Sequence, residues 1–191
     1  MQPNDAEIMQ RVQRGDFALF DELVARYRGP LVRVAESKLG DAGWAEDVVQ
    51  ETFLAVFVAR ETFNPAFSFR TWLWTILLNL CHRRHKRRAN RPDEVGHADI
   101  GHSHNVPKHL VEHETGLSHA VLAESRAALM ARLGDLPDAE ADAVRLRFFG
   151  GLKYDEIAET MGSSVSGAKR RVKNGLLKLA ASLRSEEGEE R

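Results

Sequence analysis

The chain has 191 residues, 43% of them hydrophobic, which is enough to bury the core of one large domain or of two small ones. A formal net charge of −1 argues against a protein that holds duplex DNA by bulk electrostatic attraction, so any nucleic-acid binding must come from local basic clusters. The single cysteine, Cys81, excludes an internal disulfide framework. The N-terminus lacks the pattern of a signal peptide and no apolar run is long enough to cross a bilayer, so we expect a cytoplasmic protein without membrane insertion.

Helical periodicity extends over nearly the whole chain and strand alternation is absent, which predicts an all-α fold. A short helix is expected from Asp5 to Arg14, followed by a longer helix for which Asp16 serves as the N-cap. Because proline cannot donate to the helical ladder, we expect a kink or a break at Gly29-Pro30, with helix resuming from Leu31 to Leu39.

The next predicted helix, from Trp44 to about Arg60, has an apolar face and an acidic face. Its outward stripe, spaced by three and four residues, comprises Asp47, Gln50, Glu51 and Leu54. Such a stripe can dock on a basic partner helix, although a solvated acidic face is the commoner arrangement for such residues.

The run from Phe67 to Arg88 combines an aromatic start, an apolar middle and a block of positive charge at its end, which predicts a core-facing helix. Trp72 belongs to its main apolar face, whereas Trp74, about 200° around the helix, forms a second apolar stripe with Leu78 and Cys81. The polar and increasingly basic side comprises Thr75, Asn79, His82, Arg83 and Lys86. Hydrogen-bonding groups followed by positive charge suit a nucleic-acid strand, while a core helix with a solvated basic end is the alternative.

The segment from Asn90 to His113 has turn residues and little apolar periodicity, which is typical of a linker. All eight histidines fall between His82 and His119, so a metal site is an alternative for this region. Because their spacing does not match a zinc finger and only one thiol is available, we favour a polar linker and expect neither a metal nor another cofactor.

The second half of the chain predicts a helix-turn-helix arrangement. A turn from Asp135 to Asp138 precedes a helix from Ala139 to Phe149, which Gly150-Gly151 ends. A short helix from Tyr154 to Met161 follows, and the turn from Gly162 to Ser164 leads into the last helix.

The last helix has an apolar rear face and a basic outward face. One continuous apolar stripe is expected to comprise Val165, Ala168, Val172, Leu176, Leu179 and Leu183. The helix start and its outward face comprise Ser164, Ser166, Gly167, Lys169, Arg170, Arg171, Lys173 and Asn174. A plain helical hairpin is the alternative, but a glycine turn followed by a basic face favours recognition of duplex DNA.

With both halves in view, the chain resembles a bacterial sigma factor of the extracytoplasmic-function (ECF) type, in the sigma-70 family. The run from Asp47 to Phe53 is similar to the family's polymerase-binding motif, and the run from Phe69 to Leu73, with Ile76 and Asn79, is similar to its promoter-melting helix. The family's helix-turn-helix signature is matched by Leu136-Pro137, Arg147, the run from Gly151 to Ala158 and the run from Gly162 to Val165. The resemblance extends over nearly the whole chain.

The resemblance implies two small helical domains joined by a flexible linker. A sigma-2-like domain is expected over 1–89, a linker over 90–116, a sigma-4-like helix-turn-helix domain over 117–185 and an acidic tail over 186–191. The implied function is to bind core RNA polymerase and direct promoter-specific initiation, by recognising the −35 element as a duplex and opening the −10 element. Catalysis then belongs to the polymerase, so we expect no enzymatic activity, and an anti-sigma factor is an expected further partner.

The resemblance also implies which residues carry each role. The outward stripe of Asp47, Gln50, Glu51 and Leu54 is expected to bind the polymerase. The −10 element is expected to contact Asn64, Phe67, Ser68, Thr75, Asn79, His82, Arg83 and Lys86. The −35 element is expected to contact the start and the outward face of the last helix, as defined above.

Two other functions stay open from the sequence. The first alternative is a helix-turn-helix regulator that acts without polymerase and whose N-terminal half dimerises or senses a ligand. The second is a metal-responsive interaction protein that uses the histidine-rich segment. Association with core polymerase separates the first alternative from a sigma factor, and stoichiometric zinc in the untagged protein separates the second.

Overall fold

The computed structural model describes residues 3–89 and 128–189, and every regular element in those ranges is a helix. The first half contains α1 (Asp5–Gln13), the 3₁₀ turn η1 (Phe17–Leu19), α2 (Phe20–Leu39), α3 (Ala42–Val58), the 3₁₀ turn η2 (Arg60–Thr62) and α4 (Phe69–Ala89). The second half contains a helical stretch at 128–134, α6 (Asp138–Phe148), α7 (Tyr154–Thr160) and α8 (Val165–Glu189). The predicted all-α fold is confirmed.

Local hydrogen bonds explain where the first helices begin and end. Asn4 and Glu7 form a reciprocal capping box at α1, in which each side chain accepts a hydrogen bond from the other residue's backbone N–H, at 2.9 and 3.0 Å. Gly40 ends α2 with φ at +71°, a conformation that glycine adopts without steric cost. Asp41 then begins α3 by accepting a hydrogen bond from the backbone N–H of Trp44 at 2.7 Å.

One local prediction in the first half is wrong, and another is narrowed. Asp16 makes no side-chain cap, because its carboxylate pairs instead with the Arg11 guanidinium at 2.6 Å. Of the kink or break predicted at Gly29-Pro30, the break does not occur, since α2 runs continuously from Phe20 to Leu39. An interior proline costs roughly 3 kcal/mol, and burial of apolar residues just beyond it, such as Leu31 and Val34, stabilises the continuous helix.

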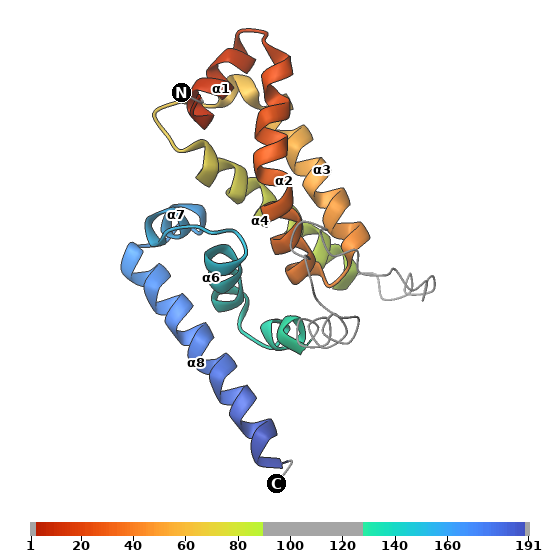
Figure 1. Cartoon of the computed structure of the whole chain (residues 1–191), viewed down its shortest axis with the longest axis vertical. Helices are drawn as coiled ribbons and strands as arrows, with labels where there is room; N and C mark the ends of the chain where they lie inside the picture. Colours follow the sequence, from red (N-terminus) through yellow and green to blue (C-terminus); the bar gives the residue numbers. More distant parts are fainter. Residues whose placement is uncertain (1–2, 90–127, 190–191) are drawn as a thin grey trace, which may run out of the picture.

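The four helices of the first half pack around one apolar core (Figure 1). Aromatic rings hold α2 to α3, where Phe20 contacts Phe53 edge to face with the ring centres 6.2 Å apart. A second aromatic group joins the loop before α4 to the start of that helix, with Phe63 next to both Phe69 and Trp72. The aromatic start of α4 therefore serves mainly as core.

In the second half, α8 crosses α6 at a glycine. A Cβ atom on Gly175 would lie 2.7 Å from Cγ2 of Val144, so only glycine allows the two helices to approach this closely. The buried line of α8 runs through Ala168, Val172 and Leu179. The predicted apolar stripe is therefore wrong in part, because Val165, Leu176 and Leu183 lie beside the buried line and are exposed. Beyond α6, α8 continues away from the other helices (Figure 1).

The two halves of the chain share a core. One cluster of buried apolar residues contains side chains of α1 to α4 together with Leu146 of α6, Leu152 before α7 and Ile157 of α7. Helix α4 lies against α7, and α2 lies against α6 (Figure 1). The predicted linker, 90–116, lies outside the described residues, so the division into two domains with that linker stays a prediction.

No helix in the described ranges is both long enough and apolar enough to span a membrane.

Candidate polymerase-binding and nucleic-acid interfaces

The outward side of α3 presents the predicted acidic stripe. Asp47, Gln50 and Glu51 are exposed, and Leu54 at the end of the stripe exposes 63% of its surface. Val58, one turn further along the same side, exposes 68%. Val58 is missing from the predicted stripe, although its position four residues after Leu54 is the signal that identifies it. The stripe is thus acidic at one end and apolar at the other.

The basic end of α4 lies beside the acidic end of this stripe. The Arg84 guanidinium is 3.1 Å from the Asp47 carboxylate and 5.5 Å from the centre of the Trp44 ring. Both groups of the ion pair contact solvent, so the pair is weak and can exchange for another partner. The exposed Asp47 carboxylate on α3 is therefore already paired with the Arg84 guanidinium in the free chain.

The turn before α4 holds an aromatic ring in solvent. The Asn64 side chain accepts a hydrogen bond from the backbone N–H of Ala66 at 2.9 Å, and the Asn64 carbonyl accepts one from the backbone N–H of Phe67 at 3.0 Å. Phe67 exposes 62% of its surface. Ser68 is also exposed, and its hydroxyl lies 3.3 Å from the backbone N–H of Thr71 in the first turn of α4. Three predicted −10 residues therefore meet in one ordered turn.

The predicted polar side of α4 divides into two groups. Asn79, Arg83 and Lys86 are exposed, and no side-chain hydrogen bond or ion pair joins them to another residue in the described ranges. They lie at positions three and four residues apart, so an amide is followed along one side of the helix by two positive charges. This arrangement suits hydrogen bonding to a base and neutralisation of a phosphate backbone.

Thr75 and His82 face the second half of the chain instead. The Thr75 hydroxyl donates to the carbonyl of Thr71 at 2.8 Å and lies 3.5 Å from the carbonyl oxygen of Thr160 in α7. His82 Nε2 lies 3.2 Å from Oδ2 of Asp142 in α6. The predicted −10 residues of α4 are therefore divided between solvent and the interface with the second half.

The helix-turn-helix predicted for the second half is present. Gly162 takes φ of +57° in the turn between α7 and α8, where glycine is favoured. The Ser164 hydroxyl accepts a hydrogen bond from the backbone N–H of Gly167 at 3.1 Å and so caps α8. A Cβ atom on Gly167 would lie 3.2 Å from this hydroxyl, so the glycine leaves room for the cap.

Most of the predicted outward face of α8 is open to solvent. The exposed members are Ser164, Ser166, Lys169, Arg170 and Lys173, whereas Gly167, Arg171 and Asn174 are half-buried. Nη1 of Arg171 is buried and hydrogen-bonds to no atom in the described ranges. The positive charge free to meet a ligand therefore comes from Lys169, Arg170 and Lys173.

A further basic contact lies beside this face and is absent from the predicted −35 set. The Arg147 guanidinium lies 5.0 Å from the centre of the Tyr154 ring, and the ammonium of Lys169 lies 5.8 Å from the same centre. Arg147 also donates a hydrogen bond to the Leu152 carbonyl at 2.8 Å. The Tyr154 ring thus keeps two positive charges together at the start of α7 and α8.

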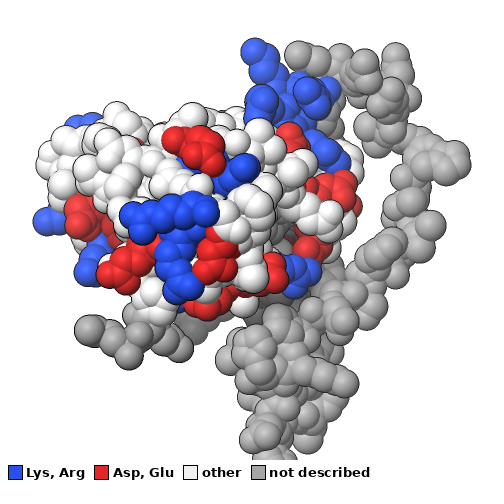
Figure 2. All heavy atoms as spheres, turned by 90° about the horizontal axis from the view of Figure 1, so that it is seen from above, with Lys and Arg blue, Asp and Glu red and all other residues white. Residues whose placement is uncertain are grey.

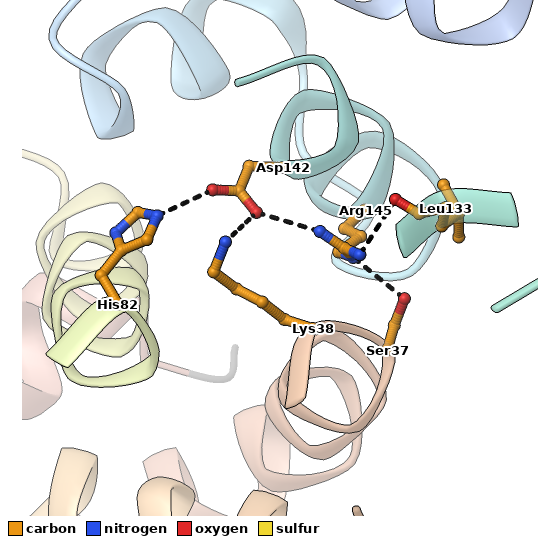
Figure 3. A network of polar contacts seen from close by, with 6 residues as sticks. All are labelled: Ser37, Lys38, His82, Leu133, Asp142 and Arg145. Atoms are coloured by element: carbon orange, nitrogen blue, oxygen red, sulfur yellow. Dashed lines mark hydrogen bonds and ion pairs between the residues drawn. The ribbon is translucent and has the colours of Figure 1, made fainter. Parts of the chain in front are cut away.

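A buried polar cluster joins α6 to the first half (Figure 3). Oδ1 of Asp142 lies 2.6 Å from the Lys38 ammonium and 3.3 Å from the Arg145 guanidinium. These three side chains expose only 3%, 5% and 5% of their surfaces, respectively. Arg145 also donates to the Ser37 hydroxyl at 3.1 Å and to the Leu133 carbonyl at 3.3 Å. Each buried charge therefore has a partner.

Asp142 stays ionised in this cluster. Burial by itself acts to raise the pKa of the carboxyl group, but hydrogen bonding to His82 and the positive charges of Lys38 and Arg145 outweigh it. The pKa of Asp142 is consequently held below its ordinary value. No sequence motif indicated this cluster, because its members come from α2, α4 and α6.

Acidic and basic side chains are mixed over the face shown in Figure 2. Blue and red groups alternate there, and no continuous basic band crosses this view, which agrees with the net charge of −1. The histidines from His97 to His119 lie outside the described residues. Within the described part of the chain, no group of three histidine, cysteine, aspartate or glutamate side chains is placed to hold a metal.

Comparison with known families matches both halves of the chain. The family model described as "Sigma-70 region 2" matches residues 23–91, which include α3, the Phe67 turn and α4. The model described as "Sigma-70, region 4" matches residues 126–179, which include the helix-turn-helix.

Curated relatives match over most of their own length. The RNA polymerase sigma-H factor of Pseudomonas aeruginosa is 30% identical over 172 residues, which cover 90% of this chain and 89% of the relative. The ECF RNA polymerase sigma-E factor of Escherichia coli K12 is 28% identical, with 90% of each chain covered.

Solved structures agree on the fold. The structure of CnrH in complex with the cytosolic domain of CnrY has a TM-score of 0.72 and 26% identity, and the alignment covers 95% of this chain and 97% of that chain. The sigma factor RpoE of Bartonella quintana, solved with the anti-sigma factor NepR, has a TM-score of 0.64 and 21% identity, with 86% and 96% covered. With the region 2 and region 4 matches and the sigma-H relative, these comparisons show that the chain belongs to the sigma-70 family and is an RNA polymerase sigma factor of the ECF type.

Proposed function

We propose that this sigma factor binds core RNA polymerase through α3, captures the opened −10 strand with α4 and its preceding turn, and recognises the −35 duplex with α8. One observation carries the proposal: a single chain presents an exposed acidic and apolar stripe on α3 and an exposed basic face on the capped first turns of α8. These two surfaces suit ligands of opposite charge, a basic protein helix and a phosphate backbone.

The α3 stripe suits a partner helix that is basic at one end and apolar at the other. Asp47 and Glu51 contribute charge complementarity, which mainly steers association and selects the partner. Leu54 and Val58 contribute apolar surface that is exposed in the free chain and becomes buried on docking. We assign Gln50 to the same contact, between the two ends.

Strand capture at the −10 element combines the Phe67 turn with the exposed side of α4. An unpaired base loses stacking worth a few kcal/mol, and an exposed aromatic ring such as Phe67 can replace part of it. Asn79 can hydrogen-bond to a base edge, while Arg83 and Lys86 neutralise backbone phosphates. Asn64 and Ser68 shape the turn that presents the ring.

At the −35 element, α8 enters the major groove with its N-terminal turns. Lys169, Arg170 and Lys173 reach phosphates or guanine edges, and the Ser164 and Ser166 hydroxyls lie at the helix start where backbone phosphates approach. Arg147, held beside Tyr154, adds a positive charge next to this face.

The family and the relatives also support the wider biological setting. Sigma factors are DNA-binding regulators, and we propose that this chain has no enzymatic activity of its own and acts in the cytoplasm, where the polymerase is. We further propose that an anti-sigma factor controls it, because RpoE, which shares its fold, was solved with the anti-sigma factor NepR. CnrH was likewise solved bound to a second protein, the cytosolic domain of CnrY.

The test is transcription in vitro by core polymerase from a randomised promoter library, with and without the purified full-length chain. The expected result is enrichment of transcripts that share two spaced elements, only when the chain is present. A chain that binds duplex DNA tightly alone and does not associate with core polymerase contradicts the proposal and indicates an independent regulator.

Two variants test the surfaces separately. Glu51→Arg is expected to reduce association with core polymerase by roughly tenfold or more without loss of helical circular dichroism, since Glu51 is exposed on α3. Arg170→Ala is expected to weaken −35 binding by about 1–3 kcal/mol if it contacts a base, and to leave core binding unchanged. Equal losses in both assays for either variant contradict the assignment of that surface.

A further inference from the structure

The second half of the chain covers one side of α4. Trp74 is fully buried, and a Cβ atom on Gly150, after α6, would lie 3.1 Å from Cη2 of its ring. Leu78 and Cys81, one and two turns further along α4, continue this side and are also buried. The second apolar stripe of α4 is therefore an interdomain contact surface, and Gly150 allows the close approach.

Polar contacts fix the same interface at both ends. Near the start of α4, Arg70 donates hydrogen bonds to the carbonyls of Gly150 and Gly151 at 3.0 and 2.9 Å. At the other end, Asp142 engages Lys38 of α2 and His82 of α4 (Figure 3). The contact is thus specific in its geometry as well as apolar.

This interface covers Thr75 and His82, two α4 residues that were predicted from the sequence to contact the −10 element and that lie beside the exposed side to which we have assigned strand capture. Thr75 lies 3.5 Å from the Thr160 carbonyl oxygen, and His82 lies 3.2 Å from the Asp142 carboxylate. A DNA strand that follows α4 from Asn79 towards the Phe67 turn needs the space next to Thr75, where α7 lies. The docked second half and the DNA strand therefore compete for one side of α4.

We propose that this arrangement is a closed, self-inhibited state of the free sigma factor, in which the helix-turn-helix domain blocks the path of the strand along α4 at Thr75 and the Lys38–Asp142 ion pair holds the domain there. The proposal rests on the strand-capture role given to α4 above. Opening moves Lys38 and Asp142 into water, where each charge is solvated, so separation of the halves leaves no buried charge behind in the first half. Polymerase or DNA that binds only the open form shifts the population towards it.

Lys38 and Asp142 form a buried ion pair at one end of the closed interface. Lys38 has one ion-pair partner among the described residues, Asp142, and the pair lies across the interface. Replacement of Lys38 therefore acts on the closed state, where it leaves Asp142 with less compensation, and has little effect on α2 itself, in which Lys38 lies in the last turn. Neither Lys38 nor Asp142 belongs to the surfaces proposed to bind polymerase or DNA.

Cys81 provides a native probe of closure. It is the only cysteine in the chain and is fully buried on the side of α4 that faces the second half. Burial, together with the negative charge of Asp142, raises the pKa of its thiol to about 12 against the opposing charges of Lys38 and Arg145. Labelling by a disulfide reagent near neutral pH is therefore slow while the chain is closed and faster when α6 moves away.

The experiment compares the full-length wild-type chain with Lys38→Glu, which places two carboxylates together, and with Lys38→Arg, which retains the positive charge. Arg28→Glu is the matched control, because it makes the same charge change at an exposed ion pair with Glu46 inside the first half. Two quantities are measured: the labelling rate of Cys81, and the affinity of the free chain for a single-stranded −10 oligonucleotide taken from the transcription selection. Circular dichroism establishes that each variant is folded.

Lys38→Glu is expected to label at least about tenfold faster than wild type and to bind the oligonucleotide more tightly, while Lys38→Arg and Arg28→Glu stay close to wild type. Unchanged labelling of folded Lys38→Glu overturns the closed state, and faster labelling without tighter binding overturns self-inhibition. If Lys38→Glu does not fold, Asp142→Asn changes the other side of the interface and is tested for the same two results.

A separate variant tests the strand-capture role itself. If Asn79→Ala in the Lys38→Glu background binds the oligonucleotide as tightly as Lys38→Glu alone, the strand-capture role is contradicted.

Discussion

Two carboxylates of this protein face guanidinium or ammonium groups in opposite surroundings. Asp142 lies 2.6 Å from Lys38 with 3% of its side chain exposed, whereas Asp47 lies 3.1 Å from Arg84 with 61% exposed. The buried group has lost its hydration and depends on its partners, while the exposed group keeps water as an alternative partner. An ion pair therefore stabilises the contact between the two halves at the buried site, whereas the exposed ion pair can exchange one partner for another.

The largest expected effect tests the buried side of this comparison. Asp142→Asn removes the carboxylate between Lys38 and Arg145 and leaves two positive charges in the buried interface. We expect the free energy of unfolding of the full chain to fall by about 3–5 kcal/mol, measured by urea denaturation followed by circular dichroism.

Asp47→Asn is the matched control, because it makes the same chemical change at the exposed pair. Its expected loss is less than about 1 kcal/mol. Similar losses for the two variants would mean that burial does not distinguish the two sites.

An intermediate effect is expected from pH. The pKa of Asp142 is lower in the folded chain than its ordinary value of about 3.9, so its stabilising contribution is complete above that value. The contribution is lost as the pH falls further, through the folded-state pKa. Urea denaturation of wild type and Asp142→Asn from pH 7 down to pH 3 should give two stability curves whose separation narrows towards the acid end. Parallel curves would show that Asp142 does not titrate differently in the folded and unfolded chains.

The smallest expected effect concerns the exposed side. Arg84→Ala removes both the ion pair with Asp47 and the contact with the Trp44 ring, which together contribute about 1 kcal/mol or less to stability at an exposed site. The same change frees Asp47 for a polymerase helix. The rate of association with core polymerase, measured by surface plasmon resonance, is therefore expected to be unchanged or slightly faster at low salt. Slower association would indicate that Arg84 itself contacts the polymerase.

Local patterns predicted the helices of this protein well, because capping residues and apolar spacing act over a few neighbouring positions. Gly150-Gly151 follows the end of α6, and Gly162 separates α7 from α8, as the sequence indicates. Pro30 shows the limit of such patterns, because tertiary burial around it keeps α2 continuous. The apolar stripe of α8 was only partly predictable, since the crossing at Gly175 decides which residues are covered.

The candidate surfaces were predictable to different degrees, because some depend on one helix and others on contacts between helices. Spacing alone identified the α3 stripe and the basic face of α8, which depend on one helix each. The division of α4 was not predictable, because Thr75 and His82 receive their neighbours from α7 and α6, far away in the sequence. Lys38 and Asp142 are separated by 104 positions, and each lies among residues whose local pattern indicates an ordinary helix.

The turn that presents Phe67 has a consequence for the kinetics of promoter opening. Hydrogen bonds to Asn64 from Ala66 and Phe67 fix this turn in the free protein, with the ring already in solvent. Little conformational entropy is then lost when a base stacks on the ring, because the ordering took place during folding. The rate at which the protein traps an unpaired base would then be limited by how often the base leaves the duplex, and not by rearrangement of the protein.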